Sequence, residues 1–83
     1  MKILYFAWLR ERLDRAEEEI ELPPGVTTVG ELIAHLRTRD EVTDAAFERP
    51  HLIRAALDTE LVEHDAPLGS ARTLALFPPM TGG

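Results

Sequence analysis

The first segment of the chain, residues 2–9 (KILYFAWL), is apolar at nearly every position. Its two alternating sets of side chains are Ile3, Tyr5 and Ala7 on one side and Leu4, Phe6 and Trp8 on the other. A half-exposed strand has one polar face. A strand with two apolar faces is either covered on both sides or keeps one face for a partner. We therefore predict a strand at residues 2–9.

The next segments favour a connection and a second strand. Leu9 and Leu13 stand one helical turn apart, which indicates a loop or a short helical turn over the charged residues 10–15. Residues 17–22 then alternate, with glutamates 17, 19 and 21 facing outward and Ile20 and Leu22 inward, as in a half-buried strand that pairs with the first. The run Glu17-Glu18-Glu19 is interpreted as an exposed acidic face. Two prolines and a glycine at 23–25 end this strand.

A helix is clearly marked after Thr28. Thr28 with Glu31 three residues later is a capping box, in which each side chain bonds the other residue's backbone. One apolar stripe follows at helical spacing, formed by Val29, Leu32, Ile33 and Leu36. Arginines 37 and 39 suit the negative end of the helix dipole. A helix with one such stripe needs one sheet face to cover.

The second half of the chain returns to strands. Residues 40–49 fit a short second helix or an ordered loop equally well, and residues 51–57 predict a strand. Asp58-Thr59 indicates a tight turn before a short return strand at 61–62, and residues 67–71 a connecting turn. The last strand is expected at residues 73–77, with Leu74 and Leu76 on one face and Ala75 and Phe77 on the other.

This order of elements predicts an α+β domain. A hairpin, a crossover helix and a final central strand describe the β-grasp, or ubiquitin-like, fold, with a mixed sheet of four to five strands and one main helix packed across one face. We expect this domain to span residues 1–77 and an extended, flexible C-terminal tail to follow at residues 78–83.

Composition narrows the possible functions. The chain has 83 residues, enough for one domain, and no cysteine, which excludes disulfides, thiolate metal sites and cysteine nucleophiles. Its net charge of −6 argues against nucleic-acid partners. The longest apolar run, residues 3–9, is too short to cross a bilayer and lacks the flanks of a secretory signal, so we expect a cytoplasmic protein without a membrane partner. The scattered histidines 35, 51 and 64 predict no metal site, and no glycine-rich phosphate loop is present.

The final segment, Phe77-Pro78-Pro79-Met80-Thr81-Gly82-Gly83, carries the candidate chemistry. Two prolines favour an extended path, so the six residues from Pro78 can reach about 20 Å. A terminal Gly-Gly lets a carboxylate pass down a channel too narrow for a Cβ atom, and it leaves the carbonyl carbon open to attack. That carboxylate needs activation, most simply by ATP as an acyl-adenylate. A sulfur nucleophile can then displace AMP and leave a thiocarboxylate.

This tail resembles the signature of the small subunits of molybdopterin synthase, the MoaD-type ubiquitin-like sulfur-carrier proteins. Four further segments are similar to that family: residues 2–7 (KILYFA), Arg10-Glu11, residues 28–32 (TVGEL) and residues 65–68 (DAPL). The similarity covers essentially the whole chain. The tail is its specific part.

The resemblance implies a defined activity. In this family the carboxylate that matches Gly83, after Gly82, is adenylated by a ubiquitin-activating-like adenylyltransferase that uses ATP, and becomes a thiocarboxylate. The tail then enters the large synthase subunit, where sulfur passes to cyclic pyranopterin monophosphate to form the molybdopterin dithiolene. Two small and two large subunits form a heterotetramer. By the resemblance, the partner-binding positions are Phe6, Leu61, Phe77, Pro78, Pro79, Met80 and Thr81. The chain itself would hold no cofactor or metal and catalyse nothing alone.

The strand pattern supports the same surface, because Phe6 and Phe77 can share the sheet face away from the helix, with Leu4, Trp8 and Ala75 beside them. Two departures from the family fall in turns: Asp58 stands where asparagine is usual, and Gly69 to Thr73 replace a more acidic turn. Three alternatives stay open: a sulfur carrier for another pathway such as thiamine thiazole synthesis, a ubiquitin-like protein modifier, or a β-grasp binding module with an inert tail.

Overall fold

The computed structural model describes residues 1–79, so the expectations for Met80, Thr81, Gly82 and Gly83 lie outside the described residues. The elements in chain order are β1 (Lys2–Tyr5), α1 (Ala7–Leu13), β2 (Glu17–Glu19), α2 (Val29–Arg37), α3 (Glu41–Ala46), the 3₁₀ helix η1 (Pro50–Leu52), β3 (Arg54–Leu57), β4 (Glu60–Val62) and β5 (Thr73–Phe77).

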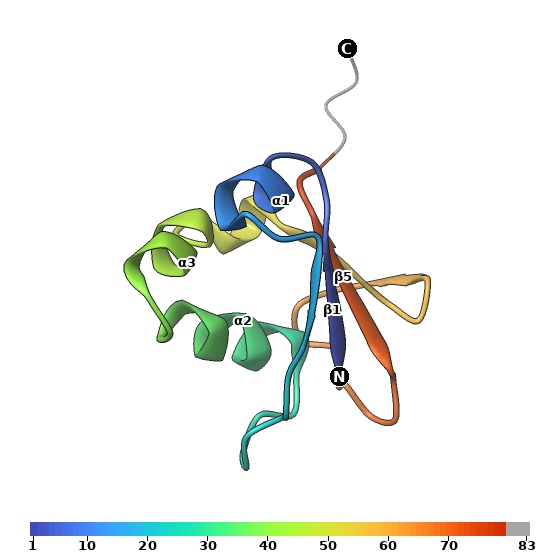
Figure 1. The fold of residues 1–83 in the computed structure, drawn as a ribbon. Helices are drawn as coiled ribbons and strands as arrows, with labels where there is room; N and C mark the ends of the chain where they lie inside the picture. The colour runs from blue at the N-terminus through green and yellow to red at the C-terminus, as the bar shows by residue number, and fades with distance from the viewer. Residues whose placement is uncertain (80–83) are drawn as a thin grey trace.

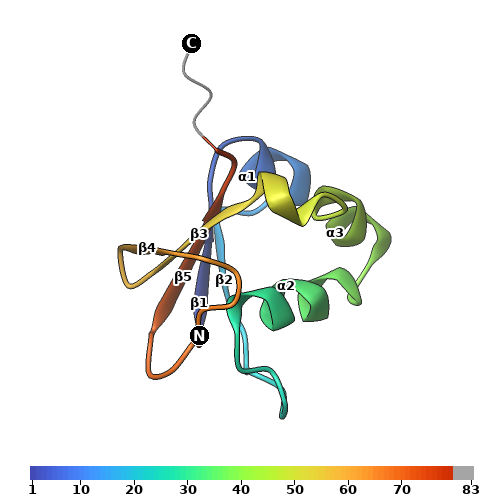
Figure 2. The ribbon, with the colours of Figure 1, turned by 180° about the vertical axis from the view of Figure 1, so that it is seen from behind.

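The strands form one mixed sheet in the order β2-β1-β5-β3-β4. β5 is central: it runs parallel to β1 on one side and antiparallel to β3 on the other. All three α-helices lie on one side of this sheet, and the opposite face is left without a helix (Figure 1 and, from behind, Figure 2). The predicted α+β, β-grasp architecture with a central last strand is confirmed.

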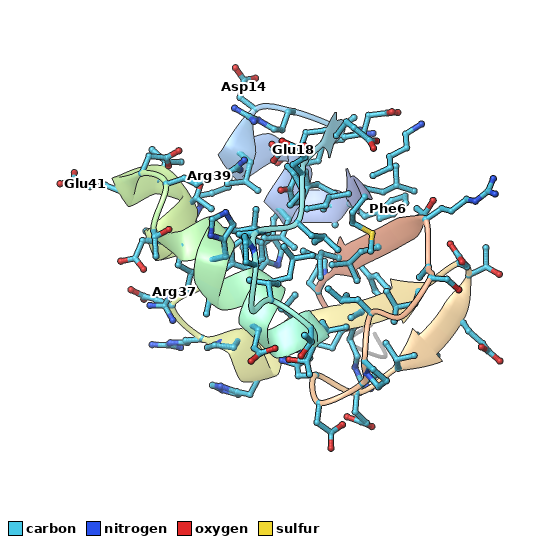
Figure 3. The ribbon with its side chains drawn as sticks, turned by 90° about the horizontal axis from the view of Figure 1, so that it is seen from below. Phe6, Asp14, Glu18, Arg37, Arg39 and Glu41 are labelled. Atoms are coloured by element: carbon cyan, nitrogen blue, oxygen red, sulfur yellow. The ribbon has the colours of Figure 1, made fainter. Side chains whose placement is uncertain are left out.

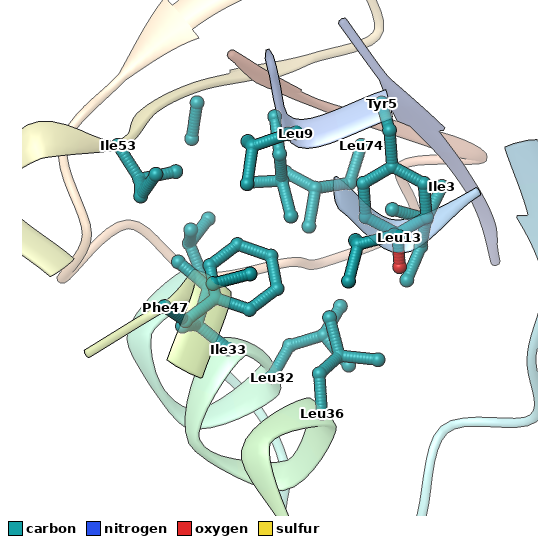
Figure 4. Packing of buried hydrophobic residues seen from close by; sticks show 14 of the residues in the cluster. Ile3, Tyr5, Leu9, Leu13, Leu32, Ile33, Leu36, Phe47, Ile53 and Leu74 are labelled. Atoms are coloured by element: carbon teal, nitrogen blue, oxygen red, sulfur yellow. The ribbon is translucent and has the colours of Figure 1, made fainter. Parts of the chain in front are cut away.

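The hydrophobic core lies between the helices and the sheet (Figure 4). Phe47, at the end of α3, is fully buried and lies close to Ile33 of α2 in the close-up. The sheet contributes the inward side chains of its two central strands, Ile3, Tyr5, Leu74 and Leu76, of which none is more than 1% exposed. A helix of 9 residues such as α2 is stable mainly because it buries its apolar stripe in this core.

The start of α2 is as the sequence predicts. Thr28 is the N-cap, and its hydroxyl accepts a hydrogen bond from the Glu31 amide at 3.2 Å. The Glu31 carboxylate in turn accepts from the amides of Thr28 and Thr27, at 3.0 and 2.8 Å. These bonds to the charged form lower the pKa of Glu31, the Thr27 backbone bond contributing most.

The first segment departs from its prediction. The strand ends at Tyr5 rather than continuing to residue 9, and Ala7, at φ 55°, turns the chain into α1. Leu9 and Leu13, at i and i+4, are the buried side chains of that helix. The helical spacing of Leu9 and Leu13 therefore determines the structure of residues 7–13, rather than the apolar run that predicts a strand. β1 and β2 still pair antiparallel as predicted, but α1 forms the connection between them.

Three smaller expectations also fail. Leu22 is 38% exposed rather than inward, because β2 ends at Glu19, before the two prolines. Residues 51–53 are not part of a strand, since Pro50 begins a 3₁₀ helix and β3 starts at Arg54. The predicted exposed acidic run 17–19 is exposed at its ends, but the side chain of Glu18 is only 12% exposed.

Glu18 is held in a network that joins β2 to the end of α2. Its carboxylate accepts two bonds from the Arg39 guanidinium, at 2.7 and 2.8 Å, and one from the Tyr5 hydroxyl at 2.6 Å (Figure 3 shows Glu18 and Arg39). Arg15 approaches the same carboxylate at 3.1 Å. The Arg39 bond, more than any other contribution, lowers the pKa of Glu18 to about 2, and burial raises the pKa of Tyr5.

Asp58 organises the turn between β3 and β4. Asp58 and Thr59 both have positive φ, 46° and 74°, as in the tight hairpin turn that the sequence predicts. The Asp58 carboxylate also accepts bonds from the backbone amides of Arg72 and Thr73, each at 3.0 Å. The two family departures noted in the sequence are therefore in direct contact, and Asp58 anchors the start of β5.

We expect Glu18→Gln to destabilise the fold by on the order of 2 kcal/mol at neutral pH. The folded-state pKa of Glu18, about 2, is below its ordinary 4.5, so its contribution is present above pH 4.5 and is lost as pH falls toward 2. Urea unfolding across this range should show a shallower loss of stability in the variant. Glu21→Gln, at an exposed position beyond β2, is the control. Equal acid sensitivity of both variants would contradict the assignment.

We expect Asp58→Ala to destabilise the domain by about 1–2 kcal/mol, because alanine disfavours positive φ and removes the acceptor of two backbone bonds. Asp58→Asn is the matched comparison, since asparagine keeps an acceptor oxygen and tolerates this conformation. Thermal unfolding of the two variants measures the difference. If both lose stability equally, the charge of Asp58 matters rather than its geometry.

Candidate functional site

The central strand β5 fixes the point at which the tail leaves the fold. Leu74 and Leu76 are fully buried, and each edge of the strand is paired, with β1 and with β3. Pro78 and Pro79 follow Phe77 directly and cannot donate to a sheet, so the strand ends there. The tail root, meaning residues 77–79, is therefore anchored by the central strand of the sheet.

The helix-free face of the sheet carries a row of apolar side chains. The strand register aligns Leu4 with Ala75, Ala75 with Ala56, and Ala56 with Leu61. Directly opposed residues share a face of the sheet, so these four side chains run across four strands. Leu61 at the end of the row is 71% exposed.

Phe6 and Phe77 lie next to this row, toward the tail. Tyr5 aligns with Leu76, and the Phe6 amide donates to the Leu76 carbonyl at 3.2 Å, so Phe6 continues the parallel pairing beside Phe77. Phe6 keeps extended backbone angles, which place its side chain on the face of Leu4. It is 46% exposed, and Phe77 is half-buried. We call the six residues Leu4, Phe6, Ala56, Leu61, Ala75 and Phe77 the sheet patch.

The structure thus brings Phe6, Leu61 and Phe77 onto one surface, as predicted from the sequence, with Pro78 and Pro79 at its edge. The prediction for Trp8 is wrong: it lies in α1 rather than beside Phe6, because the chain turns at Ala7. Met80 and Thr81 lie beyond the described residues. An exposed apolar patch next to a tail root is the kind of surface that docks a partner.

A second apolar surface, on the helix side of the tail root, was not predicted from the sequence. Trp8 and Leu52 line a groove of about 340 Å³ together with Pro78 and Pro79. Trp8 is 39% exposed and Leu52 is 38% exposed. The i, i+4 pair Leu9 and Leu13 was the available signal, because a helix that buries these two residues must turn Trp8 outward.

Within residues 1–79, no group of three histidine, aspartate or glutamate side chains lies close enough to hold a metal ion. In the same part of the chain, no helix is long and apolar enough to cross a membrane. The His64 ring nitrogen contacts the Ile53 carbonyl at 2.7 Å and so serves the fold.

The fold is similar to those of several solved structures, including the following two. A protein of Pyrococcus furiosus described as molybdopterin converting factor, subunit 1, superposes with a TM-score of 0.73 at 30% identity, over 95% of each chain. SAMP1 of Haloferax volcanii superposes with a TM-score of 0.71 over 99% of this chain and 97% of its own. At 23% identity, the second likeness concerns the fold alone.

Sequence comparisons reach the same group of proteins. The molybdopterin synthase sulfur carrier subunit of Escherichia coli is 35% identical over 85 aligned residues, which cover 100% of this chain and 99% of the relative. The resemblance drawn from the tail and the first strand is therefore confirmed along the full length. Residues 3–83 match the ThiS family. The chain belongs to the ThiS family.

Proposed function

We propose that this protein is a sulfur carrier that also acts as the small subunit of molybdopterin synthase. The observation that carries the proposal is the joint presence of a Phe-Pro-Pro-x-x-Gly-Gly tail and an apolar sheet patch at its root. The full-length likeness to the Escherichia coli sulfur carrier subunit supports it. The partner in which this chain delivers its sulfur is then a large synthase subunit.

The proposed cycle begins at the carboxylate of Gly83. A ubiquitin-activating-like adenylyltransferase uses ATP to form an acyl-adenylate on this carboxylate, with release of pyrophosphate. A sulfur donor attacks the carbonyl carbon, AMP leaves, and a thiocarboxylate remains. Gly82 and Gly83 have no side chains, so this end can enter a narrow channel in either partner. ATP belongs to the activating enzyme, and this chain supplies the acyl group.

Sulfur transfer then takes place inside the large subunit. The thiocarboxylate adds its sulfur to cyclic pyranopterin monophosphate, and water restores the carboxylate, so the chain is recharged for each sulfur of the dithiolene. The folded body holds the tail in place: the sheet patch docks on the partner, and Pro78 to Thr81 span the distance to the active site. We propose a heterotetramer of two small and two large subunits, acting in the cytoplasm.

The apolar patch explains why one small domain can serve two partners in turn. Apolar burial is not directional, so the same Phe6, Leu61 and Phe77 surface can bind two different apolar surfaces. The activating enzyme and the large subunit would each bind the sheet patch and the tail at the same time. Binding to the activating enzyme and to the large subunit must therefore be mutually exclusive.

We expect deletion of Gly83, or addition of one residue after it, to abolish thiocarboxylate formation. The reacting carbonyl would be misplaced or lost, whereas the folded body and its patch would be unchanged. Intact mass after incubation with the activating enzyme, ATP and a sulfur source measures this: the parent should gain about 16 Da, the difference between sulfur and oxygen.

The control is affinity for the large subunit, which should change little in either tail variant. If the extended chain still gains the sulfur mass, the C-terminal carboxylate is not the reacting group. If the extended chain keeps full cellular activity without gaining the mass, the protein is instead a binding module with an inert tail.

We expect Phe77→Glu to weaken binding to the large subunit by about tenfold or more, because it places a charge in an apolar interface next to the tail. Leu22→Glu is the matched control, since Leu22 is an exposed leucine outside the sheet patch. Calorimetric titration measures both. Unchanged affinity of the Phe77 variant would remove the sheet patch from the contact.

A further inference from the structure

A second groove adjoins the tail root on its helix side. It has a volume of about 390 Å³ and is lined by Trp8 and Arg12 of α1, by Ala45, Ala46, Glu48 and Arg49 at the end of α3, and by Leu52 of η1. Trp8 and Leu52 also line the groove of about 340 Å³ whose other walls are Pro78 and Pro79. The two grooves therefore lie side by side and share Trp8 and Leu52; together they are here called the helix-side groove, which borders the tail root at Pro78 and Pro79.

The two largest apolar side chains of this groove, Trp8 and Leu52, are not part of the core. Leu9 and Leu13 provide the buried face of α1, which leaves Trp8 39% exposed on the outside. Leu52 is 38% exposed on a 3₁₀ turn whose own residues are all outside the core. A large aromatic and a leucine that share an open groove are typical of an interface anchor.

The charges in the groove indicate what kind of side chain it would accept. The Arg12 guanidinium lies 5.6 Å from the centre of the Trp8 ring. In the part of the chain that the structure describes, neither Arg12 nor Arg49 forms an ion pair, whereas Arg15, Arg37 and Arg39 all do. Glu48 is the one acid that lines the groove, which leaves a surplus of one positive charge. A partner segment with an apolar side chain and a nearby carboxylate complements this arrangement.

We propose that the helix-side groove binds such an acidic, apolar segment at the mouth of the channel through which the large synthase subunit admits the tail. This inference rests on the proposed function, because it concerns the same partner. The geometry favours that partner: Pro78 and Pro79 border the helix-side groove, and Phe77 belongs to the sheet patch. A protein that binds the residues after Pro79 comes close to both the helix-side groove and the sheet patch. It would then contact the tail root on two sides.

The chain's single tryptophan gives a direct test. Full-length protein labelled with 5-fluorotryptophan has one ¹⁹F resonance, from Trp8, and the unlabelled large subunit adds none. On titration with the large subunit, we expect this resonance to shift and broaden as the exposed ring is covered. A resonance that stays in place at saturation would overturn the proposal.

Affinity measurements provide a matched comparison. Leu52 and Leu22 are both 38% exposed, so Leu52→Ala and Leu22→Ala remove the same group from equally exposed positions. We expect Leu52→Ala to weaken binding to the large subunit about tenfold, as at an interface anchor, and Leu22→Ala less than twofold. Arg12→Glu should weaken binding at low salt more than at high salt, because it reverses the charge that faces the partner. Equal affinities of the two leucine variants would contradict the proposal.

The result separates this inference from the proposed function. If Phe77→Glu and the Gly83 deletion behave as expected while the groove variants bind normally, the groove inference fails and the sulfur carrier stands. If the parent chain neither gains sulfur nor binds the large subunit, the proposed function fails. Concentration-dependent self-association abolished by Leu52→Ala would show that the groove binds a second copy, which would also overturn the inference.

Discussion

The pairing of β5 between β1 and β3 is the constraint on which the rest of the structure depends. This strand is central in a sheet of five strands, its inward leucines Leu74 and Leu76 are fully buried, and it is the last element before the tail. Because both of its edges are hydrogen-bonded, β5 cannot shift register without breaking two ladders and the core. A tail that follows such a strand directly has a fixed origin, because residues 77–79 continue from a strand that cannot shift.

The same pairing explains why β1 and β5 are apolar on both faces. Ile3 and Leu76 face the helices and form the core, while Leu4 and Phe77 face away from them. The helices α1, α2 and α3 are short, and the apolar stripe of α2 packs on one face of the sheet. The other face is therefore left uncovered by helices. The interactions that stabilise the fold, including the bond from Tyr5 to Glu18, and the exposed sheet patch therefore lie on opposite faces of the same strands. Substitutions in the sheet patch can change binding with little effect on folding.

The parts of the fold that local rules determine were predictable from the sequence. The capping box of Thr28 and Glu31, the α2 stripe and the alternation of β5 each depend on neighbouring residues alone, and the structure has all three. The end of β1 was not predictable in this way, because the turn at Ala7 depends on tertiary burial of Leu9 and Leu13. Glu18 was placed on an exposed face because its partner Arg39 is 21 residues away in the sequence. Phe6, Leu61 and Phe77 were found through the family resemblance. The spacing of Leu9 and Leu13 could have indicated an outward Trp8, whereas Leu52 needed the three-dimensional position of η1.

An exposed apolar patch on so small a protein raises a problem of self-association, and the charge distribution addresses it. Phe6 and Leu61 are exposed at 46% and 71%, so two copies could bury them against each other. The net charge of −6 opposes that encounter between copies but favours approach to a partner with a positive surface. The acidic residues of β2 contribute to this charge while Glu18 is neutralised by arginines of the fold. Long-range repulsion between like-charged copies therefore allows the apolar sheet patch to remain exposed, while apolar contact at short range remains available to a partner of complementary charge.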